Sequence, residues 1–191
     1  KDVFVKRLIE ERLKTVKEGD LMDIHTDFGV LISENASEEV ERQVQHTIAQ
    51  GAKLVYGGVR RGAYYMPTVL DNCTKEMDIC RNMEIFGPVF PVFTFRTLDE
   101  AIEIAETSDY GLSSGVITNN LQDAMKVAAS LRTGMVAVNG SGGFRAQELP
   151  FGGGKKMSGN SRECMSSVLE EVTQEKSVIF RYAMKKYNEN I

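Results

Sequence analysis

Apolar residues recur at helical spacing in two stretches near the start of the chain. The spacing of the apolar positions from Val5 to Val16 predicts a helix that ends before Gly19. A second helix is predicted from a cap at Asn35 to a stop at Gly51, because an acidic first turn follows the cap. The apolar face of this second helix consists of Val40, Val44 and Ile48.

After the second helix the pattern changes to strands, and then to an alternation of strands and helices. A strand is predicted at residues 52–56, and the residues on either side of Pro67 suit a short extended segment at the edge of a sheet or in an arm. Strands separated by helices of about ten residues indicate a parallel sheet covered on both faces. We therefore predict an α/β fold with a three-layer, doubly wound, mostly parallel sheet. Its strands beyond residue 84 are predicted at 89–95, 115–118 and 135–138, with helices that open at Thr97 and Leu121.

The C-terminal third of the chain is less periodic. Residues 139–159 contain seven of the 17 glycines and are predicted to form a long loop. A helix is predicted at residues 161–171, and a C-terminal arm strand at residues 172–182. We accordingly divide the chain into residues 1–171 and an arm with its tail, residues 172–191.

The composition excludes several classes of protein. The 191 residues carry a net charge of -4 with both signs interspersed, which gives no basic surface for nucleic acid. The apolar runs are far shorter than the roughly 20 residues that a membrane helix needs. Three cysteines without a Cys-x-x-Cys pair favour a reducing, cytoplasmic setting. The first residues, Lys1 to Arg7, have neither an initiator Met nor the apolar core of a signal peptide, so we expect either that the chain was trimmed or that it is a piece of a longer protein.

Short motifs for phosphate binding, hydrolysis and metal binding do not fit this sequence. The glycine-rich loop lacks the spacing of a P-loop or of a dinucleotide fingerprint. Residues 111–115 have the spelling of a hydrolase nucleophile elbow, but a helix is predicted before them and a strand after them, the reverse of what the elbow requires. His25 and His46 have no metal-ligand spacing. We predict no metal site.

Two other sets of residues carry groups that could take part in chemistry. Cys73, Cys80 and Cys164 lack a charged or helix-N-terminal context that would lower a thiol pKa, so a structural role is favoured for each. Glu84 and Phe86 lie just before the strand at residue 89, where ligand sites of α/β proteins gather. Taken alone, these two residues favour a solvated Glu and a core Phe over a ligand site.

Several blocks in order make the sequence resemble the NAD(P)-dependent aldehyde dehydrogenase superfamily over nearly its whole length. Any one of the blocks is weak evidence, but the ordered series is specific. The blocks are Gly51-Ala52-Lys53 with Gly57-Gly58, Pro67-Thr68-Val69-Leu70, Glu84-Ile85-Phe86-Gly87-Pro88-Val89, Tyr110-Gly111-Leu112, Gly134-Met135-Val136-Ala137-Val138-Asn139, Pro150-Phe151-Gly152-Gly153 through Lys155, Ser158-Gly159 and Arg162-Glu163.

The resemblance implies roles for four residues. Glu84 resembles the glutamate that accepts hydrogen bonds from the nicotinamide ribose, a role that suits the two oxygens of a carboxylate. Phe86 resembles the aromatic residue beside the nicotinamide ring of NAD or NADP. Phe144 and Phe151 resemble aromatic residues of the substrate tunnel, which would hold the aldehyde and exclude water.

The resemblance also implies that much of the catalytic machinery lies outside this chain. In the family a Cys thiolate attacks the aldehyde, hydride passes from the thiohemiacetal to the cofactor, and a Glu-activated water releases the carboxylic acid. The nucleophilic Cys, the base Glu, the oxyanion-stabilising Asn and the cofactor domain all correspond to positions upstream of Lys1. The chain is therefore interpreted as the C-terminal portion of such an enzyme, with no catalytic residue of its own and inactive alone.

The resemblance further implies that the arm joins a sheet of a partner subunit, in a homodimer or homotetramer. An edge strand within the same chain is the alternative for that segment. Two other functions stay open: a non-catalytic module that pairs with or regulates a full-length enzyme, and a scaffold for another ligand. The identity of the aldehyde, the choice between NAD and NADP, and hydrolytic or coenzyme A-acylating chemistry also stay open.

Overall fold

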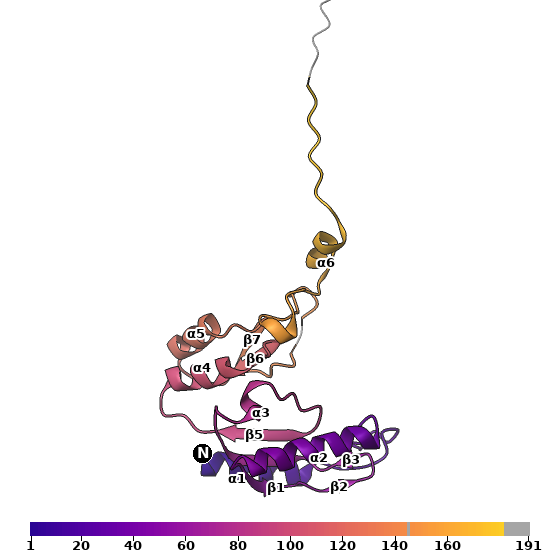
Figure 1. The fold of residues 1–191 in the computed structure, drawn as a ribbon, viewed down its shortest axis with the longest axis vertical. Coiled ribbons are helices and arrows are strands. Elements are labelled where there is room, and N and C mark those ends of the chain that lie inside the picture. The colour runs from indigo at the N-terminus through magenta and orange to yellow at the C-terminus, as the bar shows by residue number, and fades with distance from the viewer. Residues whose placement is uncertain (145, 182–191) are drawn as a thin grey trace, which may run out of the picture.

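A computed structural model describes residues 1–144 and 146–181 of the chain (Figure 1). The helices α1, α2 and α3 and the strands β1 to β5 form one part, and α4, α5, β6 and β7 form a second part beside it. The chain then leaves the second part through α6 and continues as an extended segment away from the body.

The first helical region consists of three kinds of helix in succession. α1 spans Asp2–Arg7, a π-helical turn spans Leu8–Arg12, and a 3-10 turn spans Leu13–Thr15. The prediction of one helix from Val5 to Val16 is therefore corrected to three consecutive helical segments. These turn types differ in residues per turn, so they rotate the side chains relative to a regular helix. Val5 and Leu13 are both buried in one cluster with Val69.

α2, Glu34–Ala49, is the longest helix of the described chain. Its cap is Ser33, whose Oγ accepts a hydrogen bond from the backbone N–H of Ala36 at 3.1 Å. The predicted cap Asn35 is wrong by two residues, because Ser33 already has the extended backbone that a cap requires. The predicted apolar face is confirmed for Val40 and Val44, which are fully buried.

A three-stranded sheet lies against α2 in the order β1-β4-β5. β1, Lys53–Tyr56, pairs antiparallel with β4, Thr68–Cys73, and β4 pairs parallel with β5, Val89–Phe93. The predicted edge position of the segment after Pro67 is wrong, because β4 is the central strand. Pro67 precedes the strand, so its missing N–H removes no hydrogen bond from the ladder. A short antiparallel pair, β2 at Arg60–Arg61 and β3 at Tyr64–Tyr65, stands beside this sheet.

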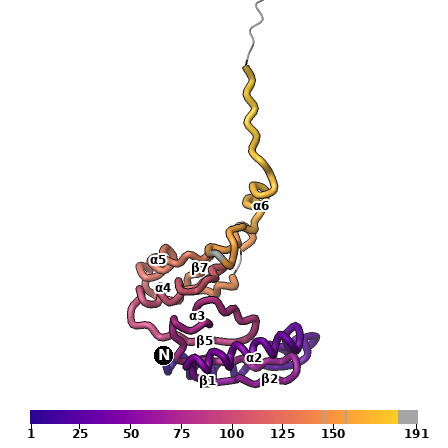
Figure 2. Tube along the Cα trace, in the orientation of Figure 1, coloured from indigo at the N-terminus to yellow at the C-terminus, as the bar shows by residue number. Residues whose placement is uncertain are grey.

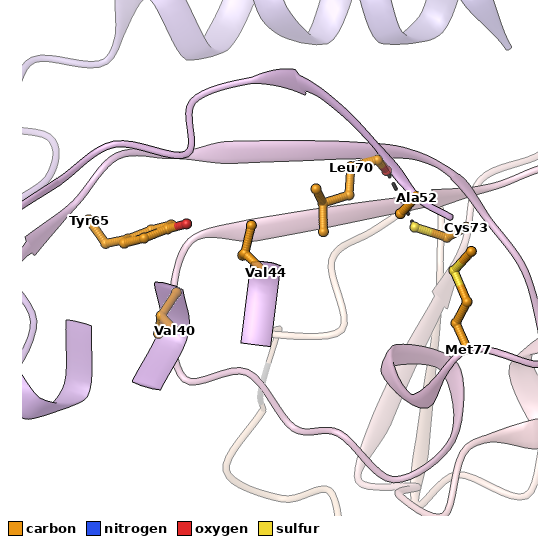
Figure 3. Packing of buried hydrophobic residues seen from close by; sticks show 7 residues of the cluster. All are labelled: Val40, Val44, Ala52, Tyr65, Leu70, Cys73 and Met77. Carbon is orange, nitrogen blue, oxygen red and sulfur yellow. Dashed lines mark hydrogen bonds between the residues drawn. The ribbon is translucent and has the colours of Figure 1, made fainter. Parts of the chain in front are cut away.

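The main core lies between α2 and the three-stranded sheet. Figure 3 shows Val40 and Val44 of α2 with Tyr65 at one end of the cluster and Leu70 of β4 in the middle. Cys73 Sγ donates a hydrogen bond to the Leu70 carbonyl at 3.6 Å within this cluster. The buried members are Val40, Val44, Ala52, Tyr65, Leu70, Cys73 and Met77.

The second part repeats a helix-strand unit. α4, Leu98–Thr107, leads to β6, Ser113–Val116, and α5, Leu121–Ser130, leads to β7, Met135–Val138. β6 and β7 pair in parallel, as the alternating pattern predicted. These elements and the parallel pair β4 and β5 confirm the α/β fold. β5 and β6 are not hydrogen-bonded to each other in the described chain.

The end of the described chain differs from the predicted pattern. A 3-10 turn spans Lys156–Ser158, and α6 spans Met165–Val172. The helix predicted at residues 161–171 therefore begins four residues later and includes Val172. Residues 173–181 are extended but form no strand with the described residues, because no second strand lies beside them (Figure 2). The remainder of the predicted arm and tail, residues 182–191, lies outside the described residues.

Candidate functional site

A short segment between α3, Asp78–Arg81, and β5 presents Glu84 and Phe86 to solvent. Exposure alternates along the segment: Met83, Ile85 and Gly87 are partly buried, whereas Glu84 is exposed and Phe86 is 77% exposed. Ile85 packs against the main core. The inward residues anchor the segment and leave a carboxylate and an aromatic ring accessible.

α2 holds the backbone of this segment from one side. The Nε2 of Gln43 donates to the carbonyl of Glu84 at 3.3 Å, and the hydroxyl of Thr47 lies 3.9 Å from the Sδ of Met83. A Cβ added to Gly87 would lie 2.7 Å from the side chain of Val40. Glycine at position 87 therefore allows the segment to approach α2 closely.

The start of α3 is held by the same helix. His46 Nε2 and Asp78 Oδ2 are 2.7 Å apart, and Gln50 Nε2 donates to the same oxygen at 2.9 Å. The backbone N–H of Asp78 donates to Gln50 Oε1 at 3.1 Å. The hydrogen bond with His46, followed by that from Gln50, holds the pKa of the Asp78 carboxyl below its usual value. These contacts place the chain that leads to Glu84.

The second part of the molecule contacts this chain at two backbone carbonyls. The N–H of Asp109 donates to the carbonyl of Arg81 at 2.8 Å, and the hydroxyl of Tyr110 donates to the carbonyl of Asn82 at 3.4 Å. Both donors lie in the turn between α4 and β6. The sequence that resembles a nucleophile elbow, residues 111–115, begins in that turn and runs into β6, so a helix precedes it and its last three residues belong to the strand.

The two candidate tunnel residues, Phe144 and Phe151, do not border a common cavity with each other or with Glu84 and Phe86. Phe144 is 62% exposed and borders a cavity of about 790 Å³ together with Leu149 and the four residues of β7. Phe151 is half-buried, and its backbone exchanges two hydrogen bonds with Glu163, at 2.8 and 2.6 Å. Glu84, Phe86 and Phe151 do not border the cavity at Phe144. The structure therefore does not bring the four predicted site residues into one cavity.

A lysine that the sequence analysis did not identify ties the glycine-rich loop to the end of α4. The side chain of Lys155 is 7% exposed, and its Nζ lies 3.2 Å from Glu106 Oε1. Nζ also donates to the carbonyls of Ala105, Glu106 and Ser108 at 3.2 to 3.5 Å. A cation at this end of a helix satisfies carbonyls that have no partner within the helix. A lone Lys in a loop gives no periodic signal, so only the block of the resemblance pointed to it.

Glu106 is shared between this lysine and Arg132. Its carboxylate accepts hydrogen bonds from the side chain and the backbone N–H of Arg132 at 2.6 and 2.8 Å. Burial acts to raise the pKa of Glu106, but the hydrogen bonds from Arg132 and Lys155 outweigh it and hold the pKa below its usual value. The ion pairs therefore keep Glu106 ionised.

The cysteines fall into two environments. Cys73 and Cys80 are buried, and burial raises the pKa of Cys73 to about 11 and that of Cys80 above its usual value. Cys164 is partly exposed at the N-cap of α6, where hydrogen bonds with Ser166 and Ser167 lower its pKa to about 7. The expectation that no cysteine has a lowered pKa is therefore wrong for Cys164, because the helix starts later than predicted.

Within residues 1–144 and 146–181, no group of three or more His, Cys, Asp and Glu side chains is placed to hold a metal ion. No helix in this part of the chain is long and apolar enough to span a membrane.

The sequence model of the aldehyde dehydrogenase family matches residues 1–178. The fold agrees with this match, and the chain belongs to the aldehyde dehydrogenase family. It is 40% identical over 176 residues to 3-sulfolactaldehyde dehydrogenase of Priestia megaterium, covering 92% of this chain and 36% of that protein. It is 37% identical over 178 residues to lactaldehyde dehydrogenase of Methanococcus maripaludis, covering 93% of this chain and 37% of that protein.

Solved structures of the same family have the same fold. Betaine aldehyde dehydrogenase of Staphylococcus aureus in complex with NAD+ matches with a TM-score of 0.83 and 36% identity, over 90% of this chain and 35% of that one. Glyceraldehyde-3-phosphate dehydrogenase of Methanocaldococcus jannaschii, complexed with NADP, matches with a TM-score of 0.82 and 36% identity, over 89% of this chain and 36% of that one. The chain thus spans about a third of the length of these relatives.

Proposed function

We propose that this chain is the C-terminal portion of an NAD(P)-dependent aldehyde dehydrogenase that oxidises an aldehyde to a carboxylic acid in the cytoplasm. Residues 1–171 would contribute part of the catalytic domain, and residues 172–191 the oligomerisation arm and tail of a homodimer or homotetramer. The observation that carries the proposal is the alternating exposure of residues 83–87, which presents Glu84 and Phe86 together on a family-matched segment.

The residues present fit a nicotinamide cofactor. Glu84 is exposed and its carboxylate offers two acceptor oxygens for the hydroxyls of a ribose. Phe86 offers an exposed aromatic face beside it for packing against a planar ring. In such an enzyme NAD or NADP, when bound, accepts the hydride from the aldehyde carbon. The role of this chain is to bind and orient the cofactor with Glu84 and Phe86.

For the aldehyde we propose a tunnel bordered by Phe144 and Phe151. The cavity at Phe144 is lined mainly by apolar residues of β7 and by Leu149, which supports a site that excludes water. Phe151 lies on a loop fixed by its backbone pair with Glu163. The cavity and this loop would converge only with the remaining two thirds of the polypeptide in place.

None of the three cysteines is proposed as the nucleophile. Cys73 and Cys80 are buried with raised pKa values, which disfavours a reactive thiolate. Cys164 has a lowered pKa, but it caps α6 and follows Arg162-Glu163, a block with no nucleophile in the resemblance. The nucleophilic Cys, the base Glu and the oxyanion Asn are therefore assigned to upstream sequence, and the 191-residue chain alone is expected to produce no NAD(P)H from aldehydes.

The open edges of the two sheets support a larger catalytic domain. β5 and β6 are joined through α4, and each has one edge without a strand partner in the described chain. An apolar cavity of about 700 Å³ lies between them, bordered by Phe93 of β5, by Phe95 after β5 and by Gly115 of β6. Unpaired apolar edges favour association with further strands. We infer that the upstream polypeptide completes the sheet there.

The test of the proposed function uses the full-length enzyme. Glu84→Gln should raise the KM for NAD or NADP about tenfold, because loss of a charged acceptor weakens its hydrogen bonds. Glu10→Gln, at an exposed position of the first helical region, is the matched control and should leave the KM unchanged. An unchanged cofactor KM in Glu84→Gln would reject the role of Glu84.

A second variant of the full-length enzyme, Cys164→Ser, tests the position of the nucleophile. Retained activity in Cys164→Ser would support the upstream assignment of the nucleophile, and loss of activity would contradict it.

A further inference from the structure

One face of α2 carries a row of polar residues directed at the segment that leads to Glu84. The row follows the segment in antiparallel order: its C-terminal members contact Asp78 and Met83, and its N-terminal member contacts Glu84. The spacing i, i+3, i+4 and i+7 places the four on one side of the helix. They are Gln43, His46, Thr47 and Gln50.

Gln43 is the member of the row that reaches Glu84 itself. The side chain of Glu84 is exposed, and the part of this residue that α2 contacts is its backbone. The Nε2 of Gln43 donates to the Glu84 carbonyl at 3.3 Å. The hydrogen bond therefore acts on the residue that would hold the cofactor, without occupying its carboxylate.

The oxygen of the Gln43 side-chain amide lies in an unusual environment. This oxygen, Oε1, is buried and has no hydrogen-bond partner among the described residues. A buried acceptor without a donor destabilises a fold, so an apolar side chain of similar size would suit stability at least as well. The amide is thus better explained by the hydrogen bond that it donates than by its contribution to the core.

We propose that Gln43 is a positioning residue for the cofactor site: its amide fixes the backbone at Glu84, so that the Glu84 carboxylate and the Phe86 ring stay on the same side. The inference rests on the proposed function insofar as Glu84 contacts the cofactor. The anchoring itself can be tested without cofactor. Thr47 against Met83 and Gly87 against Val40 are the contacts on either side, so loss of Gln43 would loosen residues 84–86, where the packing of Ile85 against the core remains.

The first experiment measures hydrogen exchange of the 191-residue chain with Gln43→Leu. Amides of residues 82–87 should exchange about fivefold faster than in the parent sequence, as expected for loss of one hydrogen bond. The unfolding midpoint in urea should be unchanged or higher, because the buried acceptor is removed together with the donor. A residue with a merely structural role would lower the midpoint and accelerate exchange throughout the core.

Two further variants control this result. Gln45→Leu makes the same substitution at an exposed position of the same helix and should change neither exchange nor midpoint. Gln43→Glu keeps the shape of the side chain but replaces the donor by a carboxylate, so it should accelerate exchange at residues 82–87 as Gln43→Leu does. Unchanged exchange at residues 82–87 in both Gln43 variants would overturn the anchoring.

The second experiment separates this inference from the proposed function in the full-length enzyme. Gln43→Leu should raise the cofactor KM about threefold to fivefold with a smaller change in kcat, since the amide acts through the position of Glu84. If Glu84→Gln raises the KM and Gln43→Leu does not, the inference fails and the proposed function stands. If Glu84→Gln has no effect, the proposed function fails, and the exchange result alone decides whether Gln43 anchors the segment.

Discussion

Residues 1–93 and residues 94–181 are stabilised in different ways. Both buried apolar clusters lie in the first region, around α2 and β4. Beyond residue 93, only Ala124 and Val127 are buried apolar residues of the described chain. The second region instead relies on close backbone approaches and on a buried ion pair, at the turn before β6 and in the glycine-rich loop.

The contacts around Gly111 illustrate the second kind of stabilisation. Its carbonyl accepts hydrogen bonds from the N–H groups of Gly134 at 3.0 Å and Gly154 at 2.8 Å, and its own N–H donates to Ser158 Oγ at 2.9 Å. A Cβ at Gly134 would collide with the backbone of Gly152. Glycine is required here for close approach of two chain segments. The first region therefore has a core of its own, whereas the second is held by close contacts between chain segments.

The largest expected difference between the regions is in thiol reactivity. At pH 7, Cys164 should be alkylated by iodoacetamide at least about a hundredfold faster than Cys73, since their pKa values are about 7 and about 11 and Cys73 is also buried. The rate at Cys164 should rise as pH increases through about 7, because only the thiolate reacts. Peptide mapping by mass spectrometry measures both sites. Equal labelling of the two native-state cysteines would contradict the contrast.

The next largest effect is expected from the same substitution made in both regions. Leu70→Ala removes a fully buried side chain from the main core and should lower the free energy of unfolding by about 3 kcal/mol. Leu169→Ala truncates a side chain of α6 that is 57% exposed and should change it by less than about 0.5 kcal/mol. Urea unfolding of the 191-residue chain measures both. Similar losses for the two variants would break the distinction between the regions.

A smaller loss is expected at the ion pair that stabilises the second region. Lys155→Met should lower the free energy of unfolding by about 2 kcal/mol near neutral pH, because it leaves Glu106 with Arg132 as its one remaining cation and removes the donor to three carbonyls at the end of α4. The folded-state pKa of Glu106 is lowered, so its contribution is present above the unfolded value of 4.5 and is lost as pH falls through the folded pKa. The difference from the parent chain should therefore shrink in acid.

The matched control for this prediction is Lys126→Met. Lys126 Nζ lies 2.5 Å from Asp99 Oδ1, but the two side chains are 48% and 76% exposed. An exposed pair of this kind contributes at most about 1 kcal/mol. Unfolding measured at several pH values compares the two variants. A loss in Lys126→Met as large as that in Lys155→Met would show that burial of the pair is not what matters.

Much of the fold could be predicted from the sequence because local periodicity is enough to specify it. The apolar face of α2 with Val40 and Val44, the start of α4 after Thr97 and the bounds of β7 follow from spacing and capping alone. The resemblance could be recognised for the same reason, since its blocks are short and local. Glu84 and Phe86 were found through such a block, and their exposure agrees with a binding role.

Contacts between residues distant in sequence were decided by the tertiary structure alone. The central position of β4 depends on strands on both sides of it, which no local pattern reveals. The lowered pKa of Cys164 depends on the residue at which α6 begins. The hydrogen bond from Gln43 joins residues 41 positions apart, and that from Lys155 to Ala105 joins residues 50 apart. The sequence by itself determined the family, the elements and the candidate carboxylate, because these are local; the residues that hold that carboxylate in place required the folded chain.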